Sequence, residues 1–275
     1  MSKFDVKDKL DNILYNAYNV ASEILYIFDF KTKNILKQNL EFKDIHLGQR
    51  CFILGTGPSL SHLTDINIEN LNKEIVFGVN SLYKSKVGSE ITPQYYALMD
   101  NLYWEELGET FSEIRKKYQS KPPIFITDIR ALKTVNLLAE NNSTIYIHSK
   151  KYPTNKMSAD IDQNIYAAMN VISYSILSAI YMGFREIYLL GCDYNAFCTS
   201  GKGHCYDDEA ELGEINYNLA FYLKFYWITT EFHYLIGKLA KRMNVSVINL
   251  TPNSLLDAYQ MDSIEKVLKQ EAKPC

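Results

Sequence analysis

The chain has 275 residues, and 47% of them are hydrophobic, so it can bury one large α/β core or two small ones. Its formal net charge of −3 and isoelectric point near 6.0 leave no global excess of basic residues to bind a nucleic acid. An odd number of cysteines and no secretory segment after Met1 favour a reducing compartment, and the cytoplasm is expected.

The first 45 residues are expected to be an N-terminal helical extension. Apolar side chains recur there at helical spacing, from Val6 to Ile27. Residues 46–260 are expected to form one Rossmann-like domain, which a C-terminal tail at 261–275 follows.

From residue 49 onward, short apolar runs alternate with helical stretches. This alternation predicts an α/β fold, in which a Rossmann-like and mostly parallel sheet carries helices on both faces. The expected strands are CFIL, EIVFGVN, QYYALMD, PIFITD, TIYIHS, EIYLLGCD and SVINLTP. The expected helices are Leu60–Leu71, Trp104–Tyr118, Arg130–Glu140, Ile165–Met182 and Ile215–Met243.

The stretch Ile165–Met182 contains no charged residue, and its length approaches that of a membrane span. It carries an asparagine and three serines and leads straight into a strand, so we interpret it as a buried helix packed on the sheet. Two irregular segments, 150–162 and 195–213, are expected to form the rim of a ligand site, because long loops in such folds lie at the carboxyl ends of strands.

A glycine turn, Gly55-Thr56-Gly57-Pro58, follows the first strand. In a doubly wound sheet such a turn brings backbone N–H groups close to a phosphate or nucleotide, so the two glycines are expected to face a ligand, with Ser59 as N-cap. The alternative is a tight strand-to-helix turn without a ligand. The third glycine of a dinucleotide fingerprint and the Walker lysine are both missing.

Several motifs accompany this turn, namely GTGPSL (55–60), VNS (79–81), GFREIYLLGCDY (183–194), HCY (204–206) and TPNSLL (251–256). In this order they resemble bacterial sialyltransferases of the lipo-oligosaccharide type. They also resemble a wider group that includes hydroxymethylpterin pyrophosphokinase-like and motility-associated proteins. The resemblance implies a glycosyltransferase A-like variant of the Rossmann-like fold, a CMP-sugar donor, an inverting reaction, and no metal or other cofactor.

The resemblance also implies which residues bind the donor, although several positions depart from the family pattern. The usual asparagine is replaced by Thr56, the phosphate-binding tyrosine by Asn195, and the sugar-binding arginine has no evident counterpart. Asn101 is an alternative to its neighbour Asp100. The expected donor-binding residues are Gly55, Thr56, Gly57, Ser59, Asn80, Ser81, Asp100, Asn170, Gly191, Asp193, Tyr194 and Asn195.

An inverting transfer needs a base for the acceptor hydroxyl and a donor of hydrogen bonds to the departing phosphate. Among five histidines, His204 is the expected base, because it lies in a glycine-rich loop and matches the family's H-Y element; His233, on an aromatic helix, is the alternative. Tyr206 is the first candidate for stabilising the leaving group, ahead of Tyr194 and Lys202.

A metal site is the alternative use of this loop. Cys198, His204, Cys205, Asp207 and Asp208 could hold zinc, but their spacing is not that of structural zinc sites, so no metal is expected. The acidic run at 207–211 could hold Mg²⁺ beside a diphosphate, or it could be a solvated helix start.

The leading interpretation is a glycosyltransferase, namely a CMP-sialic acid-dependent sialyltransferase, that transfers an acidic sugar to a surface-glycan acceptor. The alternatives are a Mg²⁺-dependent pyrophosphokinase and a non-catalytic nucleotide-binding module. The aromatic helix 221–232 is expected to line an acceptor groove, to touch a lipid-linked acceptor at the inner face of the membrane, or to pack in the core or an oligomer. The expected partners are a nucleotide sugar and a glycan, with no nucleic acid.

Overall fold

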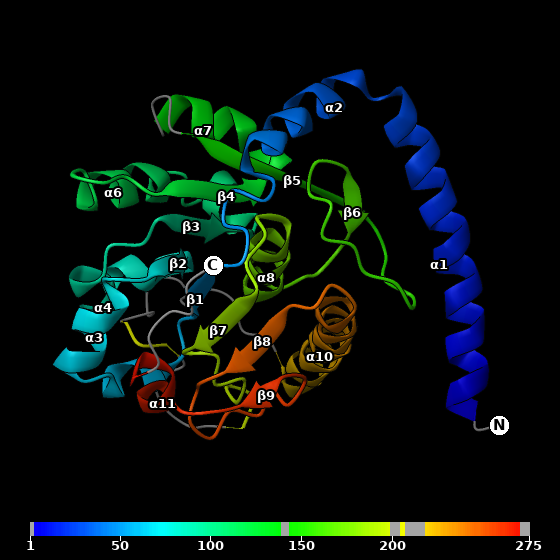
Figure 1. Cartoon of the computed structure of the whole chain (residues 1–275). Helices are drawn as coiled ribbons and strands as arrows, with labels where there is room; N and C mark the ends of the chain where they lie inside the picture. The colour runs from blue at the N-terminus through cyan, green and yellow to red at the C-terminus, as the bar shows by residue number, and fades with distance from the viewer. Residues whose placement is uncertain (1–2, 139–142, 199–203, 207–217, 270–275) are drawn as a thin grey trace.

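The computed structural model describes residues 3–138, 143–198, 204–206 and 218–269, and its centre is one parallel sheet (Figure 1). Nine strands lie in the order β6-β5-β4-β3-β2-β1-β7-β8-β9, and every neighbouring pair is parallel. The strands are β1 (Arg50–Leu54), β2 (Ile75–Val79), β3 (Tyr95–Leu98), β4 (Ile124–Asp128), β5 (Thr144–Lys151), β6 (Asn164–Tyr166), β7 (Glu186–Leu190), β8 (Ser246–Asn249) and β9 (Gln260–Met261).

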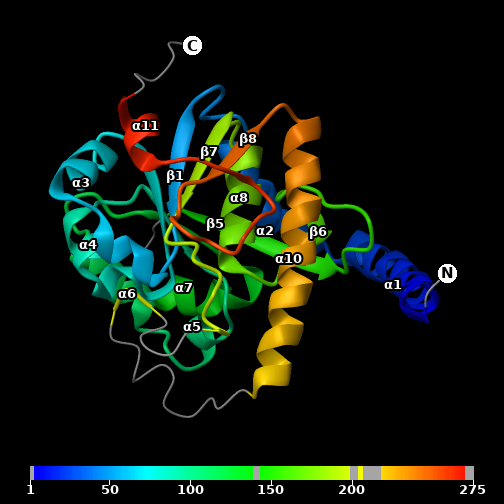
Figure 2. The ribbon, with the colours of Figure 1, turned by 90° about the horizontal axis from the view of Figure 1, so that it is seen from below.

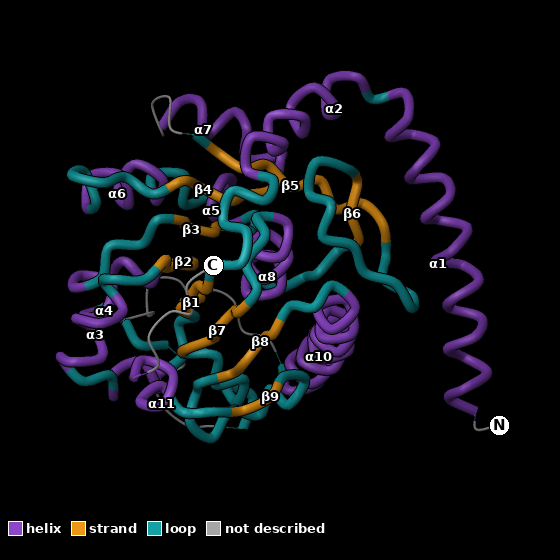
Figure 3. The backbone as a smooth tube through the Cα atoms, viewed as in Figure 1, coloured by secondary structure: helices purple, strands orange, loops and turns teal. Residues whose placement is uncertain are grey.

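Helices surround this sheet on both faces (Figure 3). The α-helices are α1 (Lys3–Phe28), α2 (Phe30–Leu36), α3 (Asp65–Leu71), α4 (Lys86–Glu90), α5 (Leu102–Glu105), α6 (Thr110–Lys117), α7 (Leu132–Leu138), α8 (Val171–Tyr181), α10 (Leu219–Arg242) and α11 (Ile264–Lys269). Four 3₁₀ segments are η1 (Lys37–Phe42), η2 (Pro58–His62), η3 (Asn80–Lys84) and η4 (Ile129–Ala131). The expected α/β fold is confirmed.

Each face of the sheet has its own hydrophobic core, because successive side chains of a strand point to opposite faces. In β1, Cys51 and Ile53 belong to one cluster, which α8 and α10 cover. Phe52 and Leu54 belong to the other cluster, which α3, α6, α7 and α11 cover. The sheet is therefore buried on both faces, which explains why its strands are nearly continuous apolar runs.

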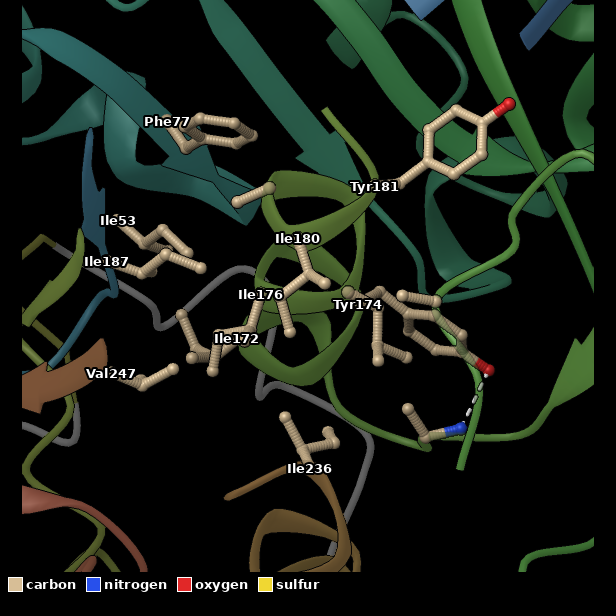
Figure 4. Close-up of a cluster of buried hydrophobic side chains, with 14 of the residues drawn as sticks. Ile53, Phe77, Ile172, Tyr174, Ile176, Ile180, Tyr181, Ile187, Ile236 and Val247 are labelled. Carbon is tan, nitrogen blue, oxygen red and sulfur yellow. Dashed lines mark hydrogen bonds between the residues drawn. The ribbon is translucent and has the colours of Figure 1, made fainter. Parts of the chain in front are cut away.

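The helix α8 lies at the centre of the first cluster (Figure 4). Its residues Ile172, Ile176 and Ile180 point toward the sheet and α10, and ten of its eleven residues are buried. This agrees with the prediction of a buried helix. No helix in the described part of the chain is long and apolar enough to cross a membrane.

The strand order places a topological switch point between β1 and β7. From β1 the chain builds the sheet outward to β6, and α8 then returns it to the opposite side of β1, where β7 follows. Ligands of open α/β sheets bind outside the carboxyl ends of the strands at such a point. The glycine turn after β1 and the turn Gly191-Cys192-Asp193 after β7, which we call the GCD turn, are in contact there.

Several expected helices are interrupted. Leu60–Leu71 is divided into η2 and α3, because the Thr64 side chain caps a new helix by accepting from the N–H of Asn67. Trp104–Tyr118 is divided into α5 and α6 around Leu107 and Gly108.

The long uncharged helix also starts later than expected. Ile165 and Tyr166 belong to the short strand β6, and α8 begins only at Val171. The backbone of Met169 has a φ of +50°, and Asn170 then caps the helix, so the chain turns before it becomes helical. The strands β6 and β9 were not expected from the sequence.

The two ends of the chain contribute to the core of the sheet domain. Asn39 of η1 is buried, and its amide group donates to the carbonyl oxygens of Tyr146 and Ile161 at 2.7 Å each. At the other end, Ile264 and Val267 of α11 are buried in the second cluster. The segments expected as an extension and a tail thus include elements that pack against the central sheet.

Candidate functional site

A cavity of about 620 Å³ opens at the carboxyl edge of the sheet, at the switch point. Its walls come from the carboxyl ends of the seven strands β1 to β7, from the start of α8 and from α10. Most of the residues expected to form the site line it, namely Gly55, Thr56, Gly57, Asn80, Asp100, Asn170, Gly191, Asp193, Tyr194, Asn195 and His204. The three exceptions are Ser59, Ser81 and Tyr206.

The glycines of the first turn are required by the neighbouring turn rather than by a ligand alone. A Cβ atom on Gly55 would lie 2.4 Å from the carbonyl oxygen of Gly191, and one on Gly57 would lie 1.8 Å from Oδ2 of Asp193. The N–H of Gly57 donates to the same Gly191 oxygen at 2.8 Å. The two glycines therefore allow the turns after β1 and β7 to touch.

Ser59 does not act as the expected N-cap. Gly57 occupies the N-cap position of η2 and makes no side-chain cap bond. Instead, the Ser59 hydroxyl donates to Oδ2 of Asp193 at 2.7 Å, and its N–H donates to Oδ1 at 3.2 Å. Because the carboxylate of Asp193 is occupied in this way, its contribution is to join the two turns.

The TPNSLL motif (251–256) is hydrogen-bonded to the GCD turn. Thr251 Oγ1 accepts from the N–H of Cys192 at 3.0 Å, and the Ser254 hydroxyl donates to the Cys192 carbonyl oxygen at 2.5 Å. The N–H of Leu255 donates to the carbonyl oxygen of Asp193 at 3.0 Å. This motif is thus a brace for the turn, and none of its residues lines the cavity.

The VNS motif (79–81) contributes Val79 and Asn80 to the cavity. Asn80 has a φ of +48°, and Oδ1 of its side chain is buried without a hydrogen-bond partner among the described residues. A buried polar atom in this state is uncommon and is a candidate for binding a ligand. Ser81, by contrast, is fully buried and does not line the cavity.

Arg130 is the one lysine or arginine within the described ranges that lines the cavity, and no sequence motif pointed to it. It follows β4, and its Nε and Nη2 donate to the two carboxylate oxygens of Asp128 at 2.9 and 3.0 Å. Its guanidinium also lies over the ring of Trp104, 5.3 Å from the centroid. The side chain is 53% exposed, so this oriented cation keeps N–H donors for an anionic ligand.

The N-terminus of α8 carries partial positive charge and is, after Arg130, a second positive group at the cavity. Asn170 caps the helix through Oδ1, which accepts from the N–H groups of Ile172 and Ser173 at 2.8 and 3.3 Å. Asn170, Val171 and Ile172 all line the cavity. The N-terminus of an α-helix favours negative charge, so Arg130 and α8 together prepare this side of the cavity for an anion.

The HCY motif is anchored to the glycine turn. The N–H of Cys205 donates to the carbonyl oxygen of Thr56 at 2.8 Å, and this bond holds His204 at the cavity wall. Tyr206 is buried, and its ring stacks on that of His204 with centroids 5.1 Å apart. Tyr206 therefore supports the histidine and does not itself reach the cavity.

Two further candidates, Tyr194 and His233, make structural contacts inside the fold. Burial raises the pKa of Tyr194 to about 12, and its hydroxyl is hydrogen-bonded to Thr229, so this residue ties the loop after β7 to α10. His233 is fully buried and shares a 2.8 Å hydrogen bond with the Tyr259 hydroxyl; burial lowers its pKa to about 3. His233 is a core residue, as the structural interpretation of its aromatic helix expected.

The expected rim is formed by only one of the two loops. Asn195 and Ala196 line the cavity, together with Phe225 and Tyr226 of the aromatic helix α10. The 150–162 segment does not: β5 extends to Lys151, and the ring of the next residue packs on α1.

No cluster of three or more histidine, cysteine or acidic side chains that could hold a metal ion occurs among the described residues. Three residues that the sequence suggested for the metal or phosphate, Lys202, Asp207 and Asp208, lie outside the described ranges. Asp100, which is exposed, and Asp128 are the carboxylates at the cavity besides Asp193.

A family of known sequences matches most of this fold. The model of the family described as "6-hydroxymethylpterin diphosphokinase MptE-like" matches residues 18–198. The chain belongs to the MptE-like family. The match includes most of the strands whose ends surround the cavity of this MptE-like protein. No curated protein matches the sequence.

Two solved structures of other proteins are similar to this chain. The sialyltransferase CstII from Campylobacter jejuni, solved with the substrate analogue CMP-3FNeuAc, is 18% identical, with a TM-score of 0.50 over 81% of this chain and 89% of that one. The MAf glycosyltransferase from Magnetospirillum magneticum AMB-1 is 13% identical, with a TM-score of 0.49 over 88% of this chain. This MptE-like protein spans only 39% of the length of that glycosyltransferase. The resemblance stated from the sequence motifs is confirmed at the level of family and fold.

Proposed function

We propose that this protein is a glycosyltransferase that moves an acidic sugar from a CMP-sugar donor to a surface-glycan acceptor with inversion. The observation that carries the proposal is the cavity at the switch point, which Asn80, Arg130, the start of α8 and His204 line together. Its volume of about 620 Å³ lies within the range of small-molecule sites. The CMP-sugar analogue bound by a protein of similar fold is consistent with this donor.

The positive side of the cavity suits the anionic part of such a donor. Arg130 is held by Asp128 in a fixed orientation, and its free N–H groups can bind a phosphate or carboxylate in a bidentate manner. The N-terminus of α8 can stabilise charge on the departing phosphate. We assign to these groups the role that the sequence had suggested for Tyr206, because Tyr206 is not among the residues that line the cavity.

The histidine at the cavity wall is the proposed base. His204 is fixed beside the glycine turn by the bond of its neighbour Cys205 to Thr56 and by stacking on Tyr206. A neutral imidazole at this place can accept the proton of an acceptor hydroxyl as that hydroxyl attacks the sugar. The Phe225 and Tyr226 side chains, which line the same cavity, offer an apolar and aromatic surface to the acceptor.

A Mg²⁺-dependent diphosphokinase is the second candidate, because the matching family carries that description. In this reaction the exposed carboxylate of Asp100 would face Mg²⁺ bound to a nucleoside triphosphate. Arg130 would then bind the triphosphate rather than the acidic sugar.

Calorimetric titration with CMP, CMP-sialic acid and ATP, each with and without Mg²⁺, separates the candidates. The glycosyltransferase proposal expects metal-independent binding of CMP and its sugar, weakened in Arg130→Gln. Binding of ATP that requires Mg²⁺, with no binding of CMP, would favour the diphosphokinase. Binding of none of these ligands would leave a non-catalytic role for the fold.

A further inference from the structure

The helix α1 is attached to the rest of the protein through its polar side. The Asn19 side chain donates to the Tyr152 carbonyl oxygen at 2.9 Å and accepts from the Tyr152 N–H at 2.6 Å. The ring of Tyr15 stacks on that of Tyr152, and Ser22 accepts from Asn164 at 3.1 Å. The side of α1 that a globular protein normally buries is apolar, so this orientation is inverted.

The opposite side of α1 is apolar and faces away from the rest of the chain. Figures 1 and 2 show α1 at the periphery, with no other helix beside its outer side. Nine large side chains on this side are 50–73% exposed, namely Leu10, Ile13, Leu14, Tyr18, Val20, Ile24, Leu25, Ile27 and Phe28. We call them, with the exposed Ala17 and Ala21, the α1 stripe.

The spacing within the α1 stripe is that of a helix that pairs with another helix. One row of the stripe alternates intervals of three and four residues without a break, through Leu10, Ile13, Ala17, Val20, Ile24 and Ile27. This is the a/d repeat of a coiled coil, in which each side chain inserts between side chains of a partner helix. A second row, on which Leu14, Ala21, Leu25 and Phe28 lie, adjoins the first and widens the contact.

The charges of this segment favour a protein partner over a membrane. Between Leu10 and Phe28 the only charged residues are Asp11 and Glu23, and neither belongs to the stripe. Helices that lie on anionic bilayers carry lysine and arginine along their polar side, whereas α1 has neither between Leu10 and Phe28, where its polar side binds the protein's own loops.

The size of the α1 stripe is sufficient for a specific contact. Nine half-exposed or more exposed large side chains amount to roughly 900 Å² of apolar surface on each copy. A partner helix that covers about half of this on each of two copies buries close to the 1,000 Å² or so that a specific interface needs in total. A contact of this modest size predicts a dimer that dissociates on dilution.

We propose that the α1 stripe is the interface of a homodimer, in which α1 of one copy packs against α1 of a second copy. An isologous contact requires one surface that is complementary to itself, and an uninterrupted a/d row without charged residues meets this requirement. The proposal does not depend on the reaction at the cavity, because the α1 stripe and the cavity share no residue.

Sedimentation velocity over a concentration series tests the proposal with the full chain. We expect the wild type to shift from a species of 31.8 kDa toward twice this mass as its concentration rises. A variant carrying Ile13→Glu and Ile24→Glu is expected to remain a monomer, because repulsion and desolvation of carboxylates oppose the contact. The matched control Asn12→Glu adds a charge to an exposed position of α1 outside the stripe and should dimerise like the wild type.

Mixing charge variants shows whether α1 binds itself. The double glutamate variant mixed with a variant carrying Ile13→Lys and Ile24→Lys should recover the heterodimer, because both positions then meet an opposite charge in a parallel or an antiparallel pair. Circular dichroism checks that each variant is folded. A wild type that stays monomeric, whether or not it binds phosphatidylglycerol vesicles, or a dimer that both double variants retain, would overturn the proposal.

Discussion

At the scale of single residues, the contact between Ser59 and Asp193 determines how the two central turns are joined. Ser59→Ala removes the 2.7 Å bond to a buried carboxylate, so we expect a loss of about 1.5–3 kcal/mol in the free energy of unfolding. Urea denaturation without any ligand measures this loss. In a double-mutant cycle with Asp193→Ala, the two effects should be less than additive; full additivity would show that the pair is not coupled.

His204 is the residue on which the proposed chemistry depends. His204→Ala should lower turnover roughly 10²–10⁴-fold, as expected for loss of a positioned general base, while the dissociation constant of the donor changes little. The control is His62→Ala, an exposed histidine of the nearby segment η2 that does not line the cavity. A His204→Ala enzyme of wild-type speed would remove the base assignment.

The buried His233 makes stability depend on pH. Burial lowers its pKa in the folded protein to about 3, so between pH 7.5 and 5.5 only the unfolded state gains the proton. The wild type should lose about 1.4 kcal/mol of unfolding free energy over this interval from this one residue. The group thus stabilises the fold above its unfolded pKa, and this contribution fades as the pH falls.

The variant His233→Gln cannot titrate and tests this effect directly. Its urea midpoint should fall less than that of the wild type between pH 7.5 and 5.5, although its stability at pH 7.5 is lower because the bond to Tyr259 changes. Equal pH dependence of the two proteins would mean that His233 is not the group responsible. Other histidines whose pKa is lowered and that both proteins share, such as His148, cancel in this comparison.

Residue-level expectations that rest on a local motif mostly fall on residues at the cavity. Asn80, Asn170 and His204 stand at the ends of recognisable strands or loops, and all of them line the cavity. Arg130 was missed because no motif surrounds it, and only the alignment of β4 with β3 and β5 brings it to the same edge. Tyr206 was overestimated because the motif does not show which of two neighbouring rings is buried.

At the scale of elements, the small helix α11 shows that the end of the chain belongs to the fold. Ile264 is buried between this helix and the second cluster. We expect Ile264→Ala to reduce the free energy of unfolding by about 2–4 kcal/mol, whereas Glu265→Ala, at an exposed position, should change it by less than about 0.5 kcal/mol. Thermal melting of both variants measures the difference, and similar melting temperatures would contradict the packing of α11.

The strands were predicted well because strands buried on both faces are continuous apolar runs with clear ends. The strands β6 and β9 were not predicted because they are only three and two residues long and lie at the two edges of the sheet. Helix starts were misplaced where a side-chain cap, such as that of Asn170, decides the first turn. The spacing of apolar residues along the sequence contains no information about such a cap.

The inverted orientation of α1 could not be read from the sequence either. Its apolar periodicity predicts a helix, but periodicity alone assigns the apolar side to the core. Here the bonds of Asn19 to Tyr152 attach the polar side instead. The apolar side is thereby left for the proposed second copy.

At the scale of the whole molecule, four motifs that are far apart in the sequence form one structure around the switch point. The glycine turn is in contact with the GCD turn. The TPNSLL segment is hydrogen-bonded to the GCD turn, and the HCY segment is hydrogen-bonded to the glycine turn. The conformation of the site is therefore built by contacts between turns, and a ligand is not needed to explain the two glycines. The arrangement leaves Asn80, Arg130 and the start of α8 available for binding.

The central claim is that this cavity binds the CMP part and the acidic sugar of a donor. Calorimetric titration of the wild type, Asn80→Ala and Arg130→Gln with CMP-sialic acid, in the presence of a chelator, tests it most directly. The account predicts metal-independent binding by the wild type, weakened at least several-fold in both variants while all three proteins remain folded. Wild-type affinity in both variants, or binding by the wild type only of ATP and only with Mg²⁺, would contradict it.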